Sequence, residues 1–158
     1  MFNKLFKKKN DIIICCPVNG KIVDISQVPD SVFSDKMMGE GIAVIPEDNI
    51  ICSPINGYVA QIFKTKHAIL LKSSDDLEII IHIGLETVNL NGEGFEVLIN
   101  EGEDVTIGKE LIKVDFEFMK NKGINTITPV VIINHADRNI IKYLGDKKAG
   151  AEIMKISQ

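Results

Sequence analysis

A ten-residue motif occurs twice in this sequence, with an offset of 37 residues between equivalent positions. Residues 16–25 read CPVNGKIVDI, and residues 53–62 read SPINGYVAQI. In each copy an Asn-Gly pair precedes a segment in which apolar and polar residues alternate, as is typical of a half-buried strand. Asn-Gly also supplies the positive φ that a tight reversal needs. The repeat therefore predicts a β-structure in which one motif is built twice.

The length and composition fit a single all-β domain. A chain of 158 residues buries about 68–70% of its unfolded surface, enough for a core without disulfides or metals. Short Val- and Ile-rich runs separated by Gly, Pro, Asn and Asp favour strands over helices. We expect a flattened antiparallel β-sandwich or barrel with a duplicated motif over residues 13–158. Short peripheral helices are expected near residues 30–33 and 116–122.

The first ten residues, MFNKLFKKKN, combine four lysines with apolar side chains. We expect residues 1–12 to form a flexible basic segment that keeps the protein in solution. The alternative is a weak contact of this segment with an anionic membrane surface. The sequence contains no apolar run long enough to span a membrane.

Charge and cysteine content limit the classes of partner and the compartment. The formal net charge is −4, and Arg138 is the only arginine. Because the chain lacks a dense stripe of Lys and Arg, nucleic acid is excluded as its main partner. Cys15, Cys16 and Cys52 have no metal-ligand spacing, and no secretory signal is present. These features predict a reduced, cytoplasmic protein.

Two of the three histidines fall in a predicted hairpin. Residues 68–72 and 77–83 are apolar, and the SSDD sequence between them favours a turn. If residues 73 and 76 close this turn, His67 lies directly opposite His82, with Cβ atoms about 4.5–5.5 Å apart. Phe63 and Thr65 then share a face with His67, and Ile80 and Gly84 share a face with His82.

A pair of imidazoles supports one kind of chemistry in particular. Neutral imidazole attacks phosphorus or carbonyl centres, and its ordinary pKa of about 6.5 leaves it mostly neutral in the cytoplasm. A second imidazole can donate a hydrogen bond to the charge of a transferred phosphoryl group. Two other interpretations remain: a pair of structural polar residues, or a zinc site at His67 and His82 that needs further ligands. His135 follows the predicted strand at residues 129–133 and is expected in a turn or on the surface.

At these residues the sequence resembles the glucose-type enzyme IIA component of the bacterial phosphoenolpyruvate-dependent sugar phosphotransferase system. The resemblance covers residues 14–156. Its most specific part is residues 82–95, HIGLETVNLNGEGF, which are similar to the family's phosphorylation-site signature. Residues 66–68 match the position of the family's second active-site histidine, and residues 28–33 with 39–41 match its docking loop.

The resemblance implies roles for four residues. His82 would accept a phosphoryl group on Nε2 from the phosphohistidine of the carrier protein HPr and pass it to a cysteine of a IIB domain. His67 would steady the phosphoryl oxygens, and Thr65 would orient His67. The carbonyl of Gly84 would accept a hydrogen bond from the protonated other ring nitrogen of His82. The resemblance implies no cofactor and, we expect, a monomer.

The resemblance also implies a docking surface for both protein partners. Its apolar collar would consist of Val32, Phe33, Phe63 and Ile80. At the rim, Asp30 and Glu86 would pair with cationic side chains of the partners, which mainly affects association rate and specificity. Ile80 stands where an aromatic residue is common and Glu86 where Asp is common, so these two positions bear on partner preference.

A rival interpretation uses the same surface differently. In it the protein is a regulatory binding protein whose unphosphorylated form docks on transporters or metabolic enzymes. Phosphorylation would then only end the binding. The transported sugar cannot be read from a chain that meets only protein partners.

Overall fold

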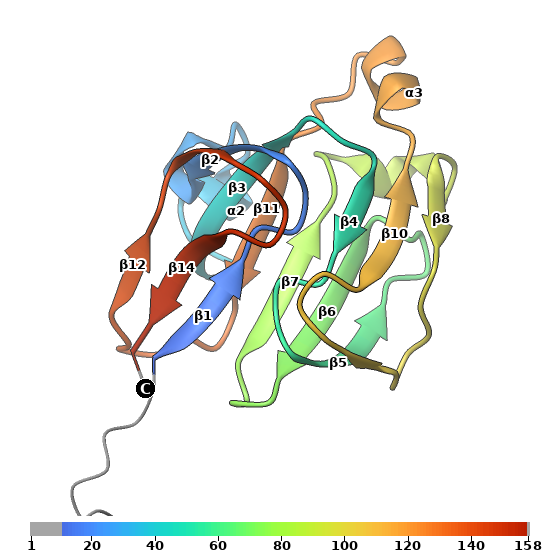
Figure 1. Cartoon of the computed structure of the whole chain (residues 1–158). Helices are drawn as coiled ribbons and strands as arrows, with labels where there is room; N and C mark the ends of the chain where they lie inside the picture. Colours follow the sequence, from blue (N-terminus) through green and yellow to red (C-terminus); the bar gives the residue numbers. More distant parts are fainter. Residues whose placement is uncertain (1–10, 158) are drawn as a thin grey trace, which may run out of the picture.

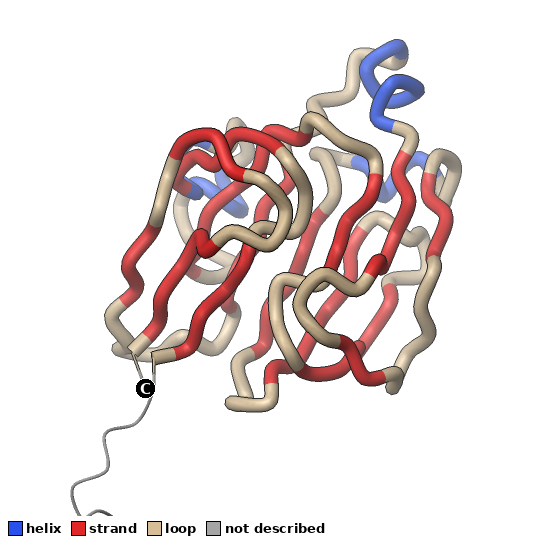
Figure 2. The backbone as a smooth tube through the Cα atoms, in the orientation of Figure 1, coloured by secondary structure: helices blue, strands red, loops and turns tan. Residues whose placement is uncertain are grey.

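The computed structural model describes residues 11–157, and Figures 1 and 2 show these residues as strands joined by loops, with a few short helices. The all-β prediction is confirmed. The predictions of a flexible basic segment and of a membrane contact fall mainly on residues 1–10, outside the described part. Of the predicted segment 1–12, Ile12 belongs to the first strand. No helix in residues 11–157 is long and apolar enough to cross a membrane.

The elements of the described chain are short. In order they are β1 (Ile12–Cys15), β2 (Gly20–Asp24), η1 (Ile25–Gln27), α2 (Ser31–Ser34), β3 (Glu40–Pro46), β4 (Ile50–Cys52), β5 (Gly57–Ile62), β6 (Ala68–Ser73), β7 (Glu78–His82), η2 (Thr87–Leu90), β8 (Phe95–Val97), β9 (Asp104–Val105), β10 (Glu110–Val114), α3 (Phe116–Asn121), β11 (Thr128–Ile132), β12 (Ile140–Lys142), β13 (Gly145–Lys147) and β14 (Glu152–Ile156). The helices predicted near residues 30–33 and 116–122 are confirmed as α2 and α3. Asp30 and Asp115 cap them, because each side chain accepts a backbone N–H of the first turn.

The strands form three antiparallel sheets whose order is symmetric. The large sheet runs β13-β2-β3-β11-β7-β6-β5-β9, and the small sheets run β1-β14-β12 and β4-β10-β8. In the large sheet the central neighbours β11 and β7 divide two equivalent halves of four strands. Figure 1 shows one small sheet in front of each half. This is the flattened sandwich with a duplicated motif that the repeat predicted.

Reciprocal hydrogen bonds join the two copies of the repeat. The N–H of Cys15 donates to the carbonyl of Pro54 at 2.9 Å, and the N–H of Cys52 donates to the carbonyl of Pro17 at 2.7 Å. Positions 15 and 17 are equivalent to 52 and 54 in the sequence repeat. The two bonds are therefore one contact made twice, and they relate the copies by an approximate twofold axis.

The glycines of the repeat have a different role from the one predicted. Neither Gly20 nor Gly57 is among the residues with positive φ, so the expected tight reversal at Asn-Gly is wrong. A Cβ on Gly20 would lie 2.2 Å from the carbonyl oxygen of Ile45, and one on Gly57 would lie 2.0 Å from that of Lys72. Glycine is needed at both positions because the neighbouring strand approaches too closely for any side chain.

Buried apolar residues form two clusters, one for each face of the large sheet. The first lies between the large sheet and the two small sheets and includes Ile14, Ile51 and Ile81. The second lies under the connection from β2 to β3 and consists of Ile25, Val28, Phe33, Ala43, Ile80, Leu85, Ile127 and Val131. Full burial of one such side chain stabilises the fold by about 1.5–3 kcal/mol. The second cluster thereby holds residues 25–39 against the end of β7.

Candidate functional site

The hairpin of β6 and β7 exists, but its register differs from the prediction by one residue. Ser73 donates its N–H to the carbonyl of Leu77 at 2.8 Å, so three residues rather than two form the connection. The last of them, Asp76, has φ of 65°, the left-handed conformation that closes three-residue hairpins. His82 consequently pairs with Ala68 instead of His67.

The two histidine rings meet nevertheless, because His67 precedes the regular strand. Lys66 has φ of 62°, and the carbonyl of His67 accepts the N–H of Ile83 at 2.7 Å. Regular alternation would place His67 on the same face as Ile69, in the first core cluster. The turn at Lys66 instead brings its ring to 4.9 Å from that of His82, centroid to centroid, in an edge-on arrangement at 78°.

A hydrogen bond to Gly84 determines the tautomer of His82. Nδ1 of His82 lies 2.7 Å from the carbonyl oxygen of Gly84. A carbonyl oxygen only accepts, so Nδ1 carries the proton and the neutral ring has its lone pair on Nε2. The ring is half-buried. His82 can therefore act as a nucleophile through one defined nitrogen.

Thr87 holds the turn that presents the Gly84 carbonyl, and the sequence reasoning missed it. The fully buried hydroxyl of Thr87 donates to the carbonyl of Ile83 at 2.6 Å. Gly84 has φ of 72°, and a Cβ there would lie 2.7 Å from Cγ2 of Thr87. The sequence feature that could have indicated this role is the position of Thr87, five residues after His82 and within residues 82–95, which resemble the phosphorylation-site signature.

The second histidine is oriented by Thr65 and packed by an aromatic ring. Oγ1 of Thr65 lies 2.6 Å from Nδ1 of His67. The ring of Phe63 packs edge-on against His67, with centroids 5.7 Å apart. His67 is only 6% exposed. Thr65, His67 and His82 are thus brought together as predicted.

Burial keeps both imidazoles neutral. Burial, and secondarily the neighbouring His82, lower the pKa of His67 to about 4. Burial also lowers the pKa of His82, although its hydrogen bond to the Gly84 carbonyl and the charge of Asp30 oppose this. At neutral pH the site therefore presents two uncharged rings.

The lowered pKa of His67 predicts a pH-dependent stability. Between pH 6.5 and about 4, the unfolded chain binds a proton that folded His67 does not bind. The free energy of unfolding therefore falls as the pH falls. From pH 7 to pH 4.5 we expect a loss of about 2 kcal/mol from this residue, measured by urea unfolding. His67→Gln should flatten this part of the profile, and an equally steep profile in that variant would assign the effect to other groups.

The four residues of the predicted apolar collar differ in exposure. The ring of Phe33 packs 5.1 Å from that of His82 and is 3% exposed. Ile80 is also buried, whereas Phe63 is half-buried and Val32 is 39% exposed. Only the last two present surface to a partner, so Phe33 and Ile80 support the site from beneath. Sequence patterns did not separate these two layers.

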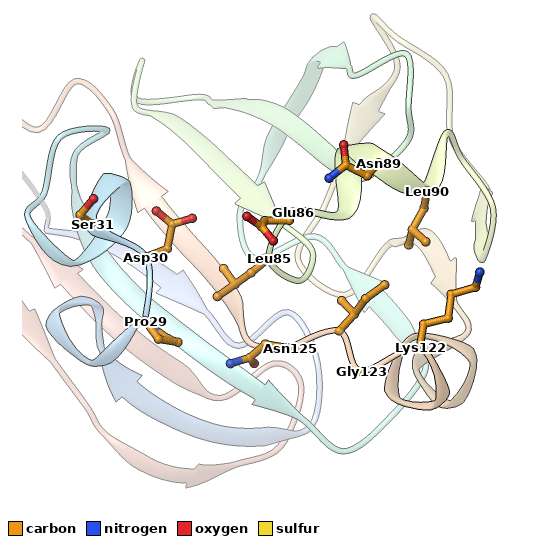
Figure 3. Close-up of a pocket in the computed structure, with 11 residues that line it drawn as sticks. Pro29, Asp30, Ser31, Leu85, Glu86, Asn89, Leu90, Lys122, Gly123 and Asn125 are labelled. Carbon is orange, nitrogen blue, oxygen red and sulfur yellow. The ribbon is translucent and has the colours of Figure 1, made fainter.

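The two predicted rim carboxylates border a pocket of about 780 Å³. Asp30 and Glu86 line it, and Figure 3 shows Lys122 at the end of α3 on another side. Neither histidine is among its lining residues. Oδ1 of Asp30 accepts the N–H of Val32 at 3.0 Å, which fixes the carboxylate at the start of α2. The exposed Glu86 has φ of 58°.

A zinc site at His67 and His82 would need ligands from elsewhere. Within residues 11–157 no group of three or more His, Cys, Asp or Glu side chains could hold a metal ion, and structural zinc takes four ligands. The three cysteines are free thiols. His135 is half-buried in the loop between β11 and β12.

Comparisons with known proteins identify the family of this chain. The model of the family "phosphoenolpyruvate-dependent sugar phosphotransferase system, EIIA 1" matches residues 12–138. A glucose-specific EIIA component of Bacillus cereus is 42% identical and aligns over 99% of both chains. A glucoside-specific EIICBA component of Staphylococcus carnosus is 45% identical over 92% of this chain, which spans only 21% of that longer protein.

A solved structure gives the same fold. The glucose permease IIA of Mycoplasma capricolum superimposes with a TM-score of 0.89 at 30% identity, covering 93% of this chain and 96% of that one. The family match covers most of the sequence and both predicted histidines. The chain belongs to the EIIA 1 family of the phosphoenolpyruvate-dependent sugar phosphotransferase system.

Proposed function

We propose that this protein is a cytoplasmic, monomeric phosphocarrier that takes a phosphoryl group from HPr and gives it to a IIB domain. In the first step the N–P bond of phosphohistidine in HPr breaks as Nε2 of His82 forms a new N–P bond. In the second step this bond breaks as a cysteine thiolate of the IIB domain forms an S–P bond. The observation that carries the proposal is the Nδ1 hydrogen bond from His82 to Gly84, 2.7 Å long.

We assign electrostatic support of the moving phosphoryl group to His67. If the Thr65 hydroxyl donates to Nδ1 across the 2.6 Å contact, the neutral ring carries its proton on Nε2. That N–H can donate to a phosphoryl oxygen as negative charge develops there. The packed rings of Phe33 and Phe63 reduce the access of water to the N–P bond. In the first step donor and acceptor are both histidines, so positioning and water exclusion supply most of what that transfer needs.

We assign partner binding to Val32, Phe63, Asp30 and Glu86. The two carboxylates beside the pocket carry negative charge toward a partner with basic side chains, and such charges act mainly on association rate and specificity. EIIA relatives are glucose-specific, and one longer relative is a glucoside-specific EIICBA component. We therefore propose glucose or a glucoside as the sugar of the pathway, with a IIB domain as the acceptor.

The proposal is tested by phosphorylation in a purified system. The protein is incubated with phosphoenolpyruvate, enzyme I and HPr, and its intact mass and modified residue are determined. We expect one acid-labile phosphoryl group, on Nε2 of His82. Absence of the added mass, with the control proteins active, would refute the phosphocarrier role and favour a binding module on the same fold.

Val32→Asp should weaken docking without harming the fold. The side chain is 39% exposed, so a carboxylate there costs little folding free energy but places charge in an apolar contact. We expect KM for phosphorylated HPr to rise about tenfold. Leu98→Asp is the matched control, because Leu98 follows β8 and is 40% exposed. Equal KM values for the two variants would remove Val32 from the docking surface.

A further inference from the structure

We propose that Lys142 is a positioning residue for partner docking, because it closes the base of residues 25–39. These residues, hereafter the docking loop, include the segment 28–33 that resembles the docking loop of the family. This inference rests on the proposed function. The docking loop connects β2 to β3 and carries Asp30, Val32 and Phe33. Lys142 belongs to none of the motifs found in the sequence and lies at the end of β12, in a different sheet.

The geometry at the base of the docking loop joins both of its ends to one cation. Asp24 is the last residue of β2, and Glu40 is the first residue of β3. Nζ of Lys142 donates to Oδ1 of Asp24 at 2.7 Å and to Oε1 of Glu40 at 2.5 Å. The Lys142 side chain is 15% exposed. A partly buried ammonium between two carboxylates is screened by water far less than a surface ion pair.

The same carboxylates also hold the first and last parts of the loop. Oδ2 of Asp24 accepts the N–H of Ser26 at 3.0 Å and its hydroxyl at 2.6 Å. Oε2 of Glu40 lies 2.8 Å from Nζ of Lys36. Each carboxylate therefore binds Lys142 with one oxygen and the docking loop with the other. This arrangement fixes both ends of the docking loop relative to β12.

Lys142 helps to keep the carboxylates of Asp24 and Glu40 ionised. Burial raises the pKa of Asp24, but hydrogen bonds from Lys142 and Ser26 outweigh burial and lower it to about 2. Burial likewise opposes ionisation of Glu40, whose pKa is lowered by Lys142 and Lys36. Two ionised carboxylates that share one ammonium repel each other when the ammonium is removed. Loss of Lys142 should then push β2 and β3 apart where the loop begins and ends.

The docking loop contacts the histidine pair at Phe33, a ring that the second buried cluster holds in place. Phe33 of the docking loop packs on the His82 ring at 5.1 Å between centroids. The ion pairs of Lys142 join it to Asp24 and Glu40, at the base of the loop. A loosened loop should therefore misplace Asp30 and Val32 and weaken docking. The phosphoryl-transfer step in the bound complex should change little, because the Gly84 and Thr65 hydrogen bonds lie outside the loop.

The test compares Lys142→Met with a matched control, Lys155→Met. Lys155 lies on the neighbouring strand β14 and forms an ion pair with Asp11 at 3.5 Å. The Lys155 side chain is 39% exposed. We expect Lys142→Met to raise KM for phosphorylated HPr about tenfold with kcat within about twofold, and Lys155→Met to change neither. In Lys142→Met/Glu40→Gln, the Gln amide can donate to Asp24, and KM should return toward the parent value.

An unchanged KM in Lys142→Met would overturn the proposal. A raised KM that Glu40→Gln does not restore would also overturn it, since the lysine would then act through general stability. Amide hydrogen exchange provides a readout that does not depend on phosphoryl transfer. Exchange should speed up over residues 25–39 in Lys142→Met and recover in the double variant. Hydrogen exchange therefore tests the Lys142 proposal even if phosphoryl transfer fails. The phosphocarrier proposal is tested separately, by the added mass of the parent protein.

Discussion

Replacing His82 with Gln is expected to abolish phosphoryl acceptance, with a loss of about six orders of magnitude in rate. The Gln amide has a similar reach and can still donate an N–H to the Gly84 carbonyl, which accepts at 2.7 Å from His82. The fold should therefore be kept. An amide nitrogen has no available lone pair, so the variant has no nucleophile to replace Nε2.

The measurement is intact mass after incubation with phosphoenolpyruvate, enzyme I and HPr. His135→Gln is the matched control, because it makes the same chemical change in the loop between β11 and β12, and it should be phosphorylated normally. A thermal transition like that of the parent protein would show that the His82 variant is folded. Normal acceptance by His82→Gln would place the phosphoryl group on another residue.

Replacing His67 with Gln should leave acceptance measurable but slow donation to a IIB domain by about 10²- to 10³-fold. The difference follows from the charge of the attacking group. In acceptance a neutral imidazole attacks the phosphoryl group, whereas in donation a negatively charged thiolate does so. Donation therefore depends more on an N–H that stabilises the phosphoryl oxygens, and the His67 ring lies 4.9 Å from the reacting ring.

Single-turnover transfer from phosphorylated protein to a purified IIB domain measures this step directly. Thr65→Val is a graded companion, because it keeps the imidazole but removes the hydroxyl 2.6 Å from its Nδ1. We expect a slowing of about tenfold in that variant. If His67→Gln donates as fast as the parent protein, His67 has a structural role only.

The hairpin shows how much of the site could be predicted from the sequence. The apolar runs and the SSDD turn correctly predicted β6 and β7. The rings of His67 and His82 do meet, but through the turn at Lys66 and not through the predicted register. The register was wrong because the turn has three residues instead of two. The Ser73 hydroxyl supports this turn locally by accepting the N–H groups of Asp75 and Leu77. Asn134, far along the chain, also supports it: its side chain donates to the Asp76 carbonyl at 2.9 Å and accepts the Glu78 N–H at 2.7 Å.

The repeat shows which part of the fold could be predicted from the sequence and which part could not. Alternation after each Asn-Gly pair correctly predicted β2 and β5 and the duplicated architecture. The reason for the glycines was wrong, because it lies in the approach of a neighbouring strand rather than in the local turn. The asparagine side chains also act at long range: Asn19 accepts the N–H of Ala149 at 2.7 Å, and Asn56 accepts that of Ile107 at 2.9 Å.

The sequence by itself determined the strand-rich class, the duplication, the family and the histidine pair, since these depend on side-chain period and on motifs within short segments. Only the tertiary structure decided the face on which His67 lies, the burial of Phe33 beneath Val32, and the placement of Lys142 between Asp24 and Glu40. The ion cluster joins residues 102 and 118 positions apart. Contacts of that separation leave no periodic signal in a single sequence, because they arise only when separate sheets pack against each other.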